Sequence, residues 1–296
     1  MNPKPGTLNP KPIHRSHHRE TYDLGDHLLL VATDGVATDS LTLSVPRKGE
    51  VCARLAAYWF GRSQHILPNH LVTLVESAGD LATYGSGLGE VPDLAGRALV
   101  VRKVEALPWV GLVTGYLVGP AMEEFRASGT VVGQHHSRHL VEGDPLPMPL
   151  FAAVRKGGTG PLLDFAALAP QVGEEEAWVM QESCLRVYRE AETPLRRQGI
   201  LLAELRCEFG RPAGGGDLLL IDELLTPDTS RLWEAAHYEP NVAWPEFATL
   251  PLEEWLEAMS VVRPDAPLQP PPEVVAATSR QYLELYRLVT GETLGQ

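Results

Sequence analysis

A hairpin in the last third of the chain carries the side chains best suited to chemistry. In ILLAELRCEFG, residues 200–210, strand alternation places Glu204, Arg206 and Glu208 on one face and apolar residues on the other. After the turn RPAGGGD, the apolar run LLLI leads to Asp222, which joins the charged face if the two strands pair in register. Such a patch suits Mg²⁺ with a phosphorylated ligand, because hard divalent cations take carboxylate and phosphate oxygens together. The alternative is a solvated sheet face with cross-strand ion pairs.

Short strands dominate the part of the chain that precedes this hairpin. DHLLLVAT (26–33) and SLTLSV (40–45) read as strands, and RKGEVCARLAAYWFGR (47–62) has apolar residues at helical spacing. HLVTLVES (70–77) and RALVVRKVEAL (97–107) continue the β-rich pattern. We expect a β-rich N-terminal lobe over residues 14–111, preceded by a flexible arm over residues 1–13.

We expect the rest of the chain, residues 112–296, to form an α+β lobe with C-terminal helices. EEEAWVMQESCLRVYREAETPLRRQG (174–199) reads as a long amphipathic helix whose acidic first turn and basic last turn suit the helix dipole, and Gly199 ends it. The hairpin follows. A Pro-rich segment then separates helical stretches at 253–259 and 275–291.

Composition limits the ligand classes. The formal net charge of −13 favours neither nucleic acid nor an anionic membrane, so the expected ligand is small, although a local basic pocket can still bind phosphate. The 3 cysteines match no metal spacing and suit a reducing cytoplasm. No apolar run is long enough for a membrane helix, and the Pro-rich start lacks the apolar block of a signal peptide.

Two segments together, GILLAELRCEFG and LLLIDELLTPDTSRLW, resemble the SAICAR synthetase family. The likeness extends in family order through YDLGDHLLLVATD, PRKGEV, AYWF, GYLVG and PLPMPLF, so it covers residues 16–233. The resemblance implies an α+β fold with an N-terminal lobe like the small lobe of a protein kinase and a ligand cleft between the lobes. It also implies a ligase in which ATP phosphorylates a carboxylate on an aminoimidazole ribonucleotide and the amine of aspartate then displaces phosphate.

The resemblance also assigns residues to roles. It implies that Asp222, Glu208 and Asp34 hold Mg²⁺, and that Arg19 and Tyr22 join Glu208 and Asp222 at ATP or a related purine nucleotide. The substrate-binding residues that it implies are Arg206, in place of a family lysine, and Asp228, Thr229, Ser230 and Arg231 in the TPDTSR turn. Lys156 and Glu204, with Arg206, complete the expected catalytic set.

This sequence departs from the family pattern at positions expected to contact ligands. The arginine and serine of the family segment around GYLVG are Thr114 and Pro120 here. Gly35 and Ala37 replace an arginine and a serine in the loop after Asp34, and Ser16 and His17 replace a glycine-lysine pair. A hydroxyl cannot reproduce a bidentate arginine clamp, so we expect a changed substrate or a changed reaction.

The segment GQHHSRHL (133–140) brings three histidines to the expected rim of the active site. His135 and His136 could supply acid-base groups near neutral pH, and His135 with His139 could hold a metal ion. The alternative is a surface loop with incidental histidines.

The leading hypothesis is therefore a SAICAR synthetase-like enzyme redirected to a modified purine or imidazole nucleotide, as in the pentostatin and coformycin pathways of nucleoside antibiotic biosynthesis. One alternative is an ATP- and Mg²⁺-dependent amide-forming ligase with a non-standard amine or carboxylate. The other is a non-catalytic nucleotide-binding partner of a biosynthetic complex. A homo-oligomer is compatible with each hypothesis.

Overall fold

The computed structural model describes residues 11–38, 41–84, 93–157, 160–241, 246–262 and 268–295. Most of the arm expected at residues 1–13 lies outside these ranges. Contacts divide the chain into two compact units: Met1–Gly61, His70–Val104 and Ala248–Gln296 form the first, and Arg62–Asn69 with Glu105–Phe247 form the second. This division differs from the limits expected from the sequence, because the C-terminal helices belong to the first unit.

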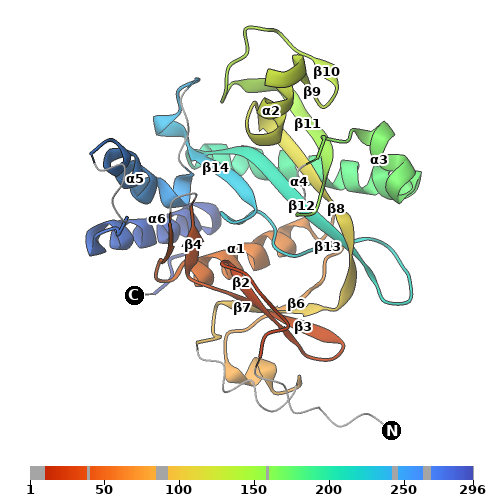
Figure 1. Cartoon of the computed structure of the whole chain (residues 1–296). Helices are drawn as coiled ribbons and strands as arrows, with labels where there is room; N and C mark the ends of the chain where they lie inside the picture. Colours follow the sequence, from red (N-terminus) through yellow and green to blue (C-terminus); the bar gives the residue numbers. More distant parts are fainter. Residues whose placement is uncertain are drawn as a thin grey trace. The chain divides into compact units, whose positions relative to one another are not determined.

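The first unit contains an antiparallel sheet and the helix that follows its first strands (Figure 1). The strand order is β1 (His14–Arg15), β2 (Arg19–Asp23), β3 (His27–Ala32), β7 (Ala98–Arg102) and β6 (Leu71–Leu74). A small ribbon of β4 (Gly35–Ala37) and β5 (Thr42–Ser44) precedes α1 (Lys48–Ser63), and a 3-10 turn η1 spans Ala78–Leu81. The predicted strands and helix of this region are confirmed.

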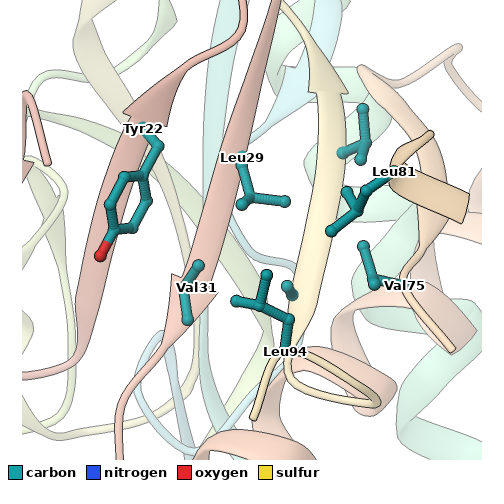
Figure 2. Packing of buried hydrophobic residues seen from close by; sticks show 8 residues of the cluster. Tyr22, Leu29, Val31, Val75, Leu81 and Leu94 are labelled. Atoms are coloured by element: carbon teal, nitrogen blue, oxygen red, sulfur yellow. The ribbon is translucent and has the colours of Figure 1, made fainter. Parts of the chain in front are cut away.

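One face of this sheet is covered by an apolar cluster (Figure 2). Leu29 and Val31 alternate inward on β3, where strand period two predicts them, and Tyr22 on β2 lies beside them. Val75 and Leu94 cover the cluster from the segments after β6 and before β7. Burial of these side chains fixes the strand register, because a one-residue slip would turn them to solvent.

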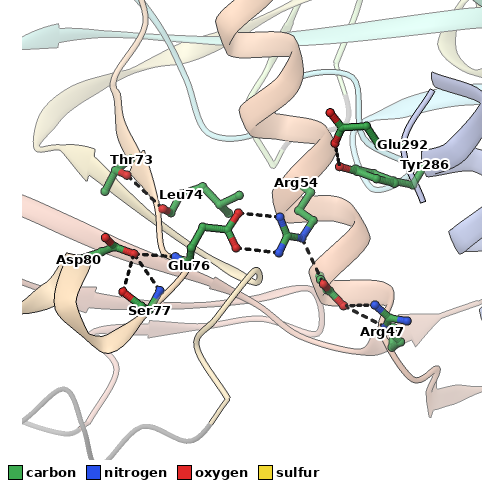
Figure 3. Close-up of polar contacts among 10 residues, drawn as sticks. Arg47, Arg54, Thr73, Leu74, Glu76, Ser77, Asp80, Tyr286 and Glu292 are labelled. Atoms are coloured by element: carbon green, nitrogen blue, oxygen red, sulfur yellow. Dashed lines mark hydrogen bonds and ion pairs between the residues drawn. The ribbon is translucent and has the colours of Figure 1, made fainter. Parts of the chain in front are cut away.

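Ion pairs connect α1 to the segment that follows β6 (Figure 3). The Arg54 guanidinium donates to both carboxylate oxygens of Glu76, at 2.7 and 2.8 Å, and to Glu50 at 3.1 Å. Arg47 donates to the same Glu50 at 3.0 Å. Bidentate geometry makes the Arg54–Glu76 pair the best-defined contact of this network.

The C-terminal helices of the first unit are α5 (Leu250–Val262) and α6 (Pro272–Thr290), which pack on each other, and the 3-10 turn η4 spans Phe247–Thr249. Ser279 of α6 donates to the backbone oxygen of Pro46 at 2.7 Å, and Arg47 donates to that of Gly295 at 2.6 Å. These bonds hold the C-terminal segment beside the start of α1, which explains why the unit is assembled from distant parts of the chain.

The second unit contains a sheet in the order β11 (Pro145–Arg155), β8 (Val104–Tyr116), β12 (Ile200–Pro212) and β13 (Leu219–Ile221), and β14 (Ser230–Glu234) also pairs with β12. The long helix α4 (Glu174–Arg197) packs on β12, with α3 (Phe165–Val172) against α4. Helix α2 (Gly119–Ser128) precedes the hairpin of β9 (Thr130–Val131) and β10 (Gln134–His135), and η3 spans Ala235–His237. The predicted amphipathic helix is confirmed, with buried Ala177, Met180, Cys184 and Ala191 at helical spacing.

In the described ranges, no helix is both long and apolar enough to span a bilayer. Cys52, Cys184 and Cys207 are all buried free thiols.

Candidate active site

A pocket of about 190 Å³ opens at the junction of β12, the TPDTSR turn and β14. Every substrate-binding residue expected from the sequence lines this pocket. The lining residues are Glu204, Arg206, Pro227, Asp228, Thr229, Ser230, Arg231 and Glu246. The structure therefore brings together side chains from three separate parts of the second unit.

Strand pairing sets the geometry of this pocket. Glu204 on β12 lies directly opposite Arg231 on β14, and Leu205 lies opposite Ser230. The turn that leads into β14 is closed by a bond from the Ser230 N–H to the Thr226 oxygen at 2.9 Å. Its start is fixed by the Thr226 hydroxyl, which donates to Glu223 at 3.0 Å. Backbone and side-chain bonds thus hold the turn in place around the pocket.

Glu204 is the most buried ionisable group of the pocket, with 4% of its surface exposed. Its Oε2 atom is buried and has no hydrogen-bond partner among the described residues. Burial raises the pKa of the Glu204 carboxyl, and the positive charges of Arg231 and Arg206 oppose this shift. The carboxylate fits because residue 119 is glycine: a Cβ there would lie 3.1 Å from Glu204 Oε2.

The remaining polar groups offer both donors and acceptors. Arg231 Nη1 lies 3.3 Å from Glu246 Oε1, and Arg206 Nη1 lies 4.0 Å from Glu204 Oε1. Within the described ranges, the buried Ser230 Oγ and Arg231 Nε also lack hydrogen-bond partners. Buried polar groups are normally satisfied, so this set is arranged to bind a polar ligand.

The charged face of β12 continues beyond the pocket. Glu208 forms an ion pair with Lys156, which follows β11 directly. Both are expected site residues, so the structure brings them together. Asp222 does not join this face as expected, because the register pairs Glu208 with Ile221 and β13 ends there. The φ of 68° at Asp222 breaks strand alternation at that residue.

Glu208 and Asp222 nevertheless remain neighbours across the β12–β13 pair, one position apart in register. Mg²⁺ in nucleotide sites is commonly held by one or two carboxylates, with phosphates and water completing the shell, so two carboxylates are enough in number. The described residues contain no cluster of three or more His, Cys, Asp or Glu side chains arranged for a metal ion.

The expected nucleotide and metal residues of the first unit have structural partners. Asp34 accepts a bond from the Gly49 N–H at 2.9 Å, near the start of α1, and lies 3.5 Å from Arg97. Tyr22 is a core residue whose hydroxyl donates to Glu20 at 2.6 Å, and burial raises its pKa to about 12. Arg19 is half-buried at the start of β2, opposite Ala32. Core packing alone accounts for Tyr22, so its nucleotide role stays a prediction.

The histidine segment forms a small hairpin on the second unit. His135 lies on β10 and is exposed, as is His139, whereas His136 is half-buried. The hairpin is anchored by Glu124 of α2, which accepts from the Val132 N–H at 3.0 Å and the Gly133 N–H at 2.8 Å. This anchoring and exposure favour the surface-loop alternative over a metal site.

The departures at Thr114 and Pro120 have clear structural consequences. Thr114 is 1% exposed, and its hydroxyl donates to the backbone oxygen of Tyr116 at 2.5 Å. Pro120 occupies the first turn of α2 and removes one N–H from that helix terminus. Neither residue offers a side-chain donor to a ligand.

Two features of the pocket were missed from the sequence. The turn was expected to extend through Ser230 and Arg231, which instead begin strand β14; its burial pattern does not alternate, because Leu232 and Trp233 are both buried. Glu246 was not singled out, because it is fifteen residues beyond Arg231 and no local pattern marks it.

Comparisons with known proteins agree with this fold. The family model described as SAICAR synthetase matches residues 13–258. The phosphoribosylaminoimidazole-succinocarboxamide synthase of Thioalkalivibrio sulfidiphilus is 35% identical over 287 residues, which cover 94% of each chain. The enzyme of the same name from Saccharopolyspora erythraea is 37% identical over 276 residues, covering 90% of this chain and 89% of the relative.

Among solved structures, the SAICAR synthase of Saccharomyces cerevisiae complexed with SAICAR matches with a TM-score of 0.85 and 28% identity. The match covers 98% of this chain and 97% of the yeast chain. The predicted α+β fold is therefore confirmed. The chain belongs to the SAICAR synthetase family and is an enzyme of the ligase type.

Proposed function

We propose that this enzyme is an ATP- and Mg²⁺-dependent amide-forming ligase that acts on a phosphoribosyl purine or imidazole nucleotide, with a substrate or amine different from that of its relatives. The observation that carries the proposal is the pocket of about 190 Å³ in which Arg206 and Arg231 flank the buried Glu204. Two guanidiniums suit a phosphate or carboxylate, and the unsatisfied Glu204 Oε2 suits a hydroxyl or amine of the same ligand.

The site residues of β12, β14 and the adjoining segments then serve either ligand binding or charge stabilisation. Arg231 and Arg206 bind the anionic groups of the nucleotide substrate, and Ser230 donates to it. The Lys156 ammonium, now paired with Glu208, stabilises negative charge during phosphoryl transfer from ATP to the substrate carboxylate. Glu208 and Asp222 would hold Mg²⁺, which would neutralise phosphate charge. An amine then attacks the activated carboxyl carbon, forms the C–N bond, loses a proton and releases phosphate.

A changed substrate is supported by positions 114 and 120. The Thr114 hydroxyl already donates a hydrogen bond to the backbone oxygen of Tyr116, and Pro120 has neither a hydroxyl nor an N–H. Loss of a charged hydrogen bond costs roughly 1.5–3 kcal/mol, so two such losses would slow an unchanged reaction by orders of magnitude. Modified nucleotides of specialised nucleoside biosynthesis, of the pentostatin and coformycin kind, are substrates of the expected class.

A second candidate is the reaction that the relatives' names describe. It is favoured by identities of 35% and 37% over 90% or more of this chain. Under this candidate Arg206 and Arg231 together would bind the groups that an arginine at position 114 would otherwise contact.

One assay separates the two candidates. The chain is mixed with ATP, Mg²⁺, aspartate and the carboxylated aminoimidazole ribonucleotide, and formation of the succinocarboxamide product is followed. A turnover below about 1 s⁻¹, the lower end of common enzyme rates, is expected for the redirected enzyme. Robust turnover that the variant Arg231→Lys diminishes would establish the second candidate.

A further inference from the structure

We propose that the second unit carries an additional small-molecule site, formed by α4 and the first half of β11, that takes a planar aromatic molecule with one anionic group. A pocket of about 330 Å³ lies there. It shares no lining residue with the candidate active site. Its volume falls in the range of sites for small molecules, about 300–1,000 Å³.

The floor of this pocket is aromatic. Tyr116 at the end of β8 and Tyr188 of α4 both line it. Their hydroxyls are already engaged: the Tyr188 hydroxyl donates to the Leu202 oxygen at 2.7 Å, and Arg196 donates to the Tyr116 hydroxyl at 3.3 Å. Tyr116 and Tyr188 are 4% and 3% exposed, so they contribute a small, rigid apolar ring surface to the floor. Gly115 leaves room for this arrangement, since a Cβ there would lie 1.8 Å from the Tyr188 hydroxyl.

The opposite wall comes from the sequence PLPMP at the start of β11. Pro145, Pro147 and Pro149 have no N–H, so this edge of the sheet cannot pair regularly with an added strand. Met148 is 62% exposed, and its thioether side chain adapts to an aromatic neighbour. The wall is thus suited to a flat apolar body and unsuited to an extended peptide.

One charged side chain that lines the pocket, Arg189, has no ion-pair partner among the described residues. Arg196 Nε donates to Glu192 Oε1 at 2.6 Å, so these two charges offset each other. Arg189 lies on the same side of α4, two turns before Arg196, and also lines the pocket. It has neither an ion pair nor a hydrogen bond within the part of the chain that the structure describes. A free guanidinium beside an apolar floor binds one carboxylate or phosphate group in bidentate geometry.

Binding is tested with phenyl phosphate, benzoate and the neutral benzyl alcohol, by saturation-transfer NMR on the full chain. Both anions are expected to bind, with benzyl alcohol at least about tenfold weaker, because it lacks the charge-assisted bond. Comparison of the two anions distinguishes a phosphate monoester site from a carboxylate site. Equal binding of all three probes, or none at 10 mM (on the order of the weakest useful affinities), overturns the proposal.

Variants locate the binding. Arg189→Gln removes the free charge and Thr193→Trp fills the pocket; both residues are exposed, so folding is expected to persist. Each is expected to weaken phenyl phosphate binding about tenfold. The matched control is Arg186→Gln, on the same helix but outside the pocket, where the guanidinium lies 3.9 Å from Glu190. Binding that survives Arg189→Gln but is lost in Arg231→Lys belongs to the candidate active site and contradicts the proposal.

Discussion

The carboxyl group of Glu204 is ionisable, yet its Oε2 atom is shielded from water. Its pKa in the folded chain is raised above the ordinary 4.5, so the folded state binds the proton more tightly than the unfolded state. The resulting stabilisation is fully present below the unfolded pKa and is lost as pH rises through the folded pKa.

The variant Glu204→Gln lacks this titration. The melting temperature of the variant minus that of the parent chain is therefore expected to increase as the pH is raised from 4 to 8 (roughly the span over which a raised carboxyl titrates). Thermal melts in a pH series measure this difference. The exposed Glu239→Gln serves as the control and should follow the parent at every pH. A constant difference for Glu204→Gln would show that Arg206 and Arg231 keep the carboxylate charged throughout.

Arg231 contributes a planar donor group as well as a charge. The substitution Arg231→Lys keeps the charge but removes the fork that faces Glu204 and the pocket. It is expected to raise the KM for the nucleotide substrate by about tenfold or more, with a smaller effect on the KM for ATP. Steady-state kinetics measure both constants. The exposed Arg138→Lys should change neither.

Side-chain alternation allowed part of this site to be predicted. Glu204, Arg206 and Glu208 fall on one face of β12 because a regular strand has a period of two. Asp222 could not be predicted in the same way, because its φ of 68° is a local backbone choice that alternation does not encode. Glu246 could not be predicted either, since its place beside Arg231 depends on how the chain returns to β14.

At the scale of elements, the start of α2 limits what the candidate active site can accommodate. Gly119 has a φ of 51°, and a Cβ there would lie 3.1 Å from Glu204 Oε2. Gly119→Ala therefore adds backbone strain and a contact with the buried carboxylate. Gly129, the residue that ends α2, has a φ of 74°, but a Cβ added there would meet no atom within 4 Å.

These two glycines form a matched pair for measurement. Gly129→Ala is expected to cost about 1 kcal/mol of unfolding free energy from the left-handed backbone alone. Gly119→Ala should cost about 1–2 kcal/mol more and should also weaken substrate binding. Urea unfolding gives both free energies. If the two variants lose equal free energy of unfolding, the Cβ contact with Glu204 does not affect stability.

The long elements could be predicted from their periodicity, whereas the short ones could not. Helix α4 has its apolar residues at 3.6-residue spacing and ends beside Gly199, whose φ is 78°. Strand β13 is three residues long and β14 five, so neither has enough alternation to be separated from the turns around it. The candidate site depends on these short strands, which is why its boundary was less predictable than its central residues.

At the scale of the whole molecule, a net charge of −13 gives no general attraction for a nucleotide. Under the proposed function, binding comes from local cations such as Arg206 and Arg231, and Glu208 and Asp222 would hold Mg²⁺. A ligand that binds only the native state stabilises it by RT ln(1 + [L]/Kd), about 2.7 kcal/mol at 100 times Kd. For a chain of this length, this corresponds to a melting temperature raised by roughly 5 °C.

We expect such a rise with a purine or aminoimidazole nucleotide in the presence of Mg²⁺, and a smaller rise when EDTA replaces the metal. Asp222→Asn keeps the shape of the side chain but removes a metal-binding charge, so the Mg²⁺-dependent part of the rise should disappear while the melting temperature without ligand stays nearly unchanged. Differential scanning fluorimetry with adenine, inosine and aminoimidazole nucleotides measures both parts. If none of these nucleotides shifts the parent chain at millimolar concentration, the nucleotide ligase proposal is wrong. If Asp222→Asn keeps the full Mg²⁺ effect, the metal lies elsewhere in the protein.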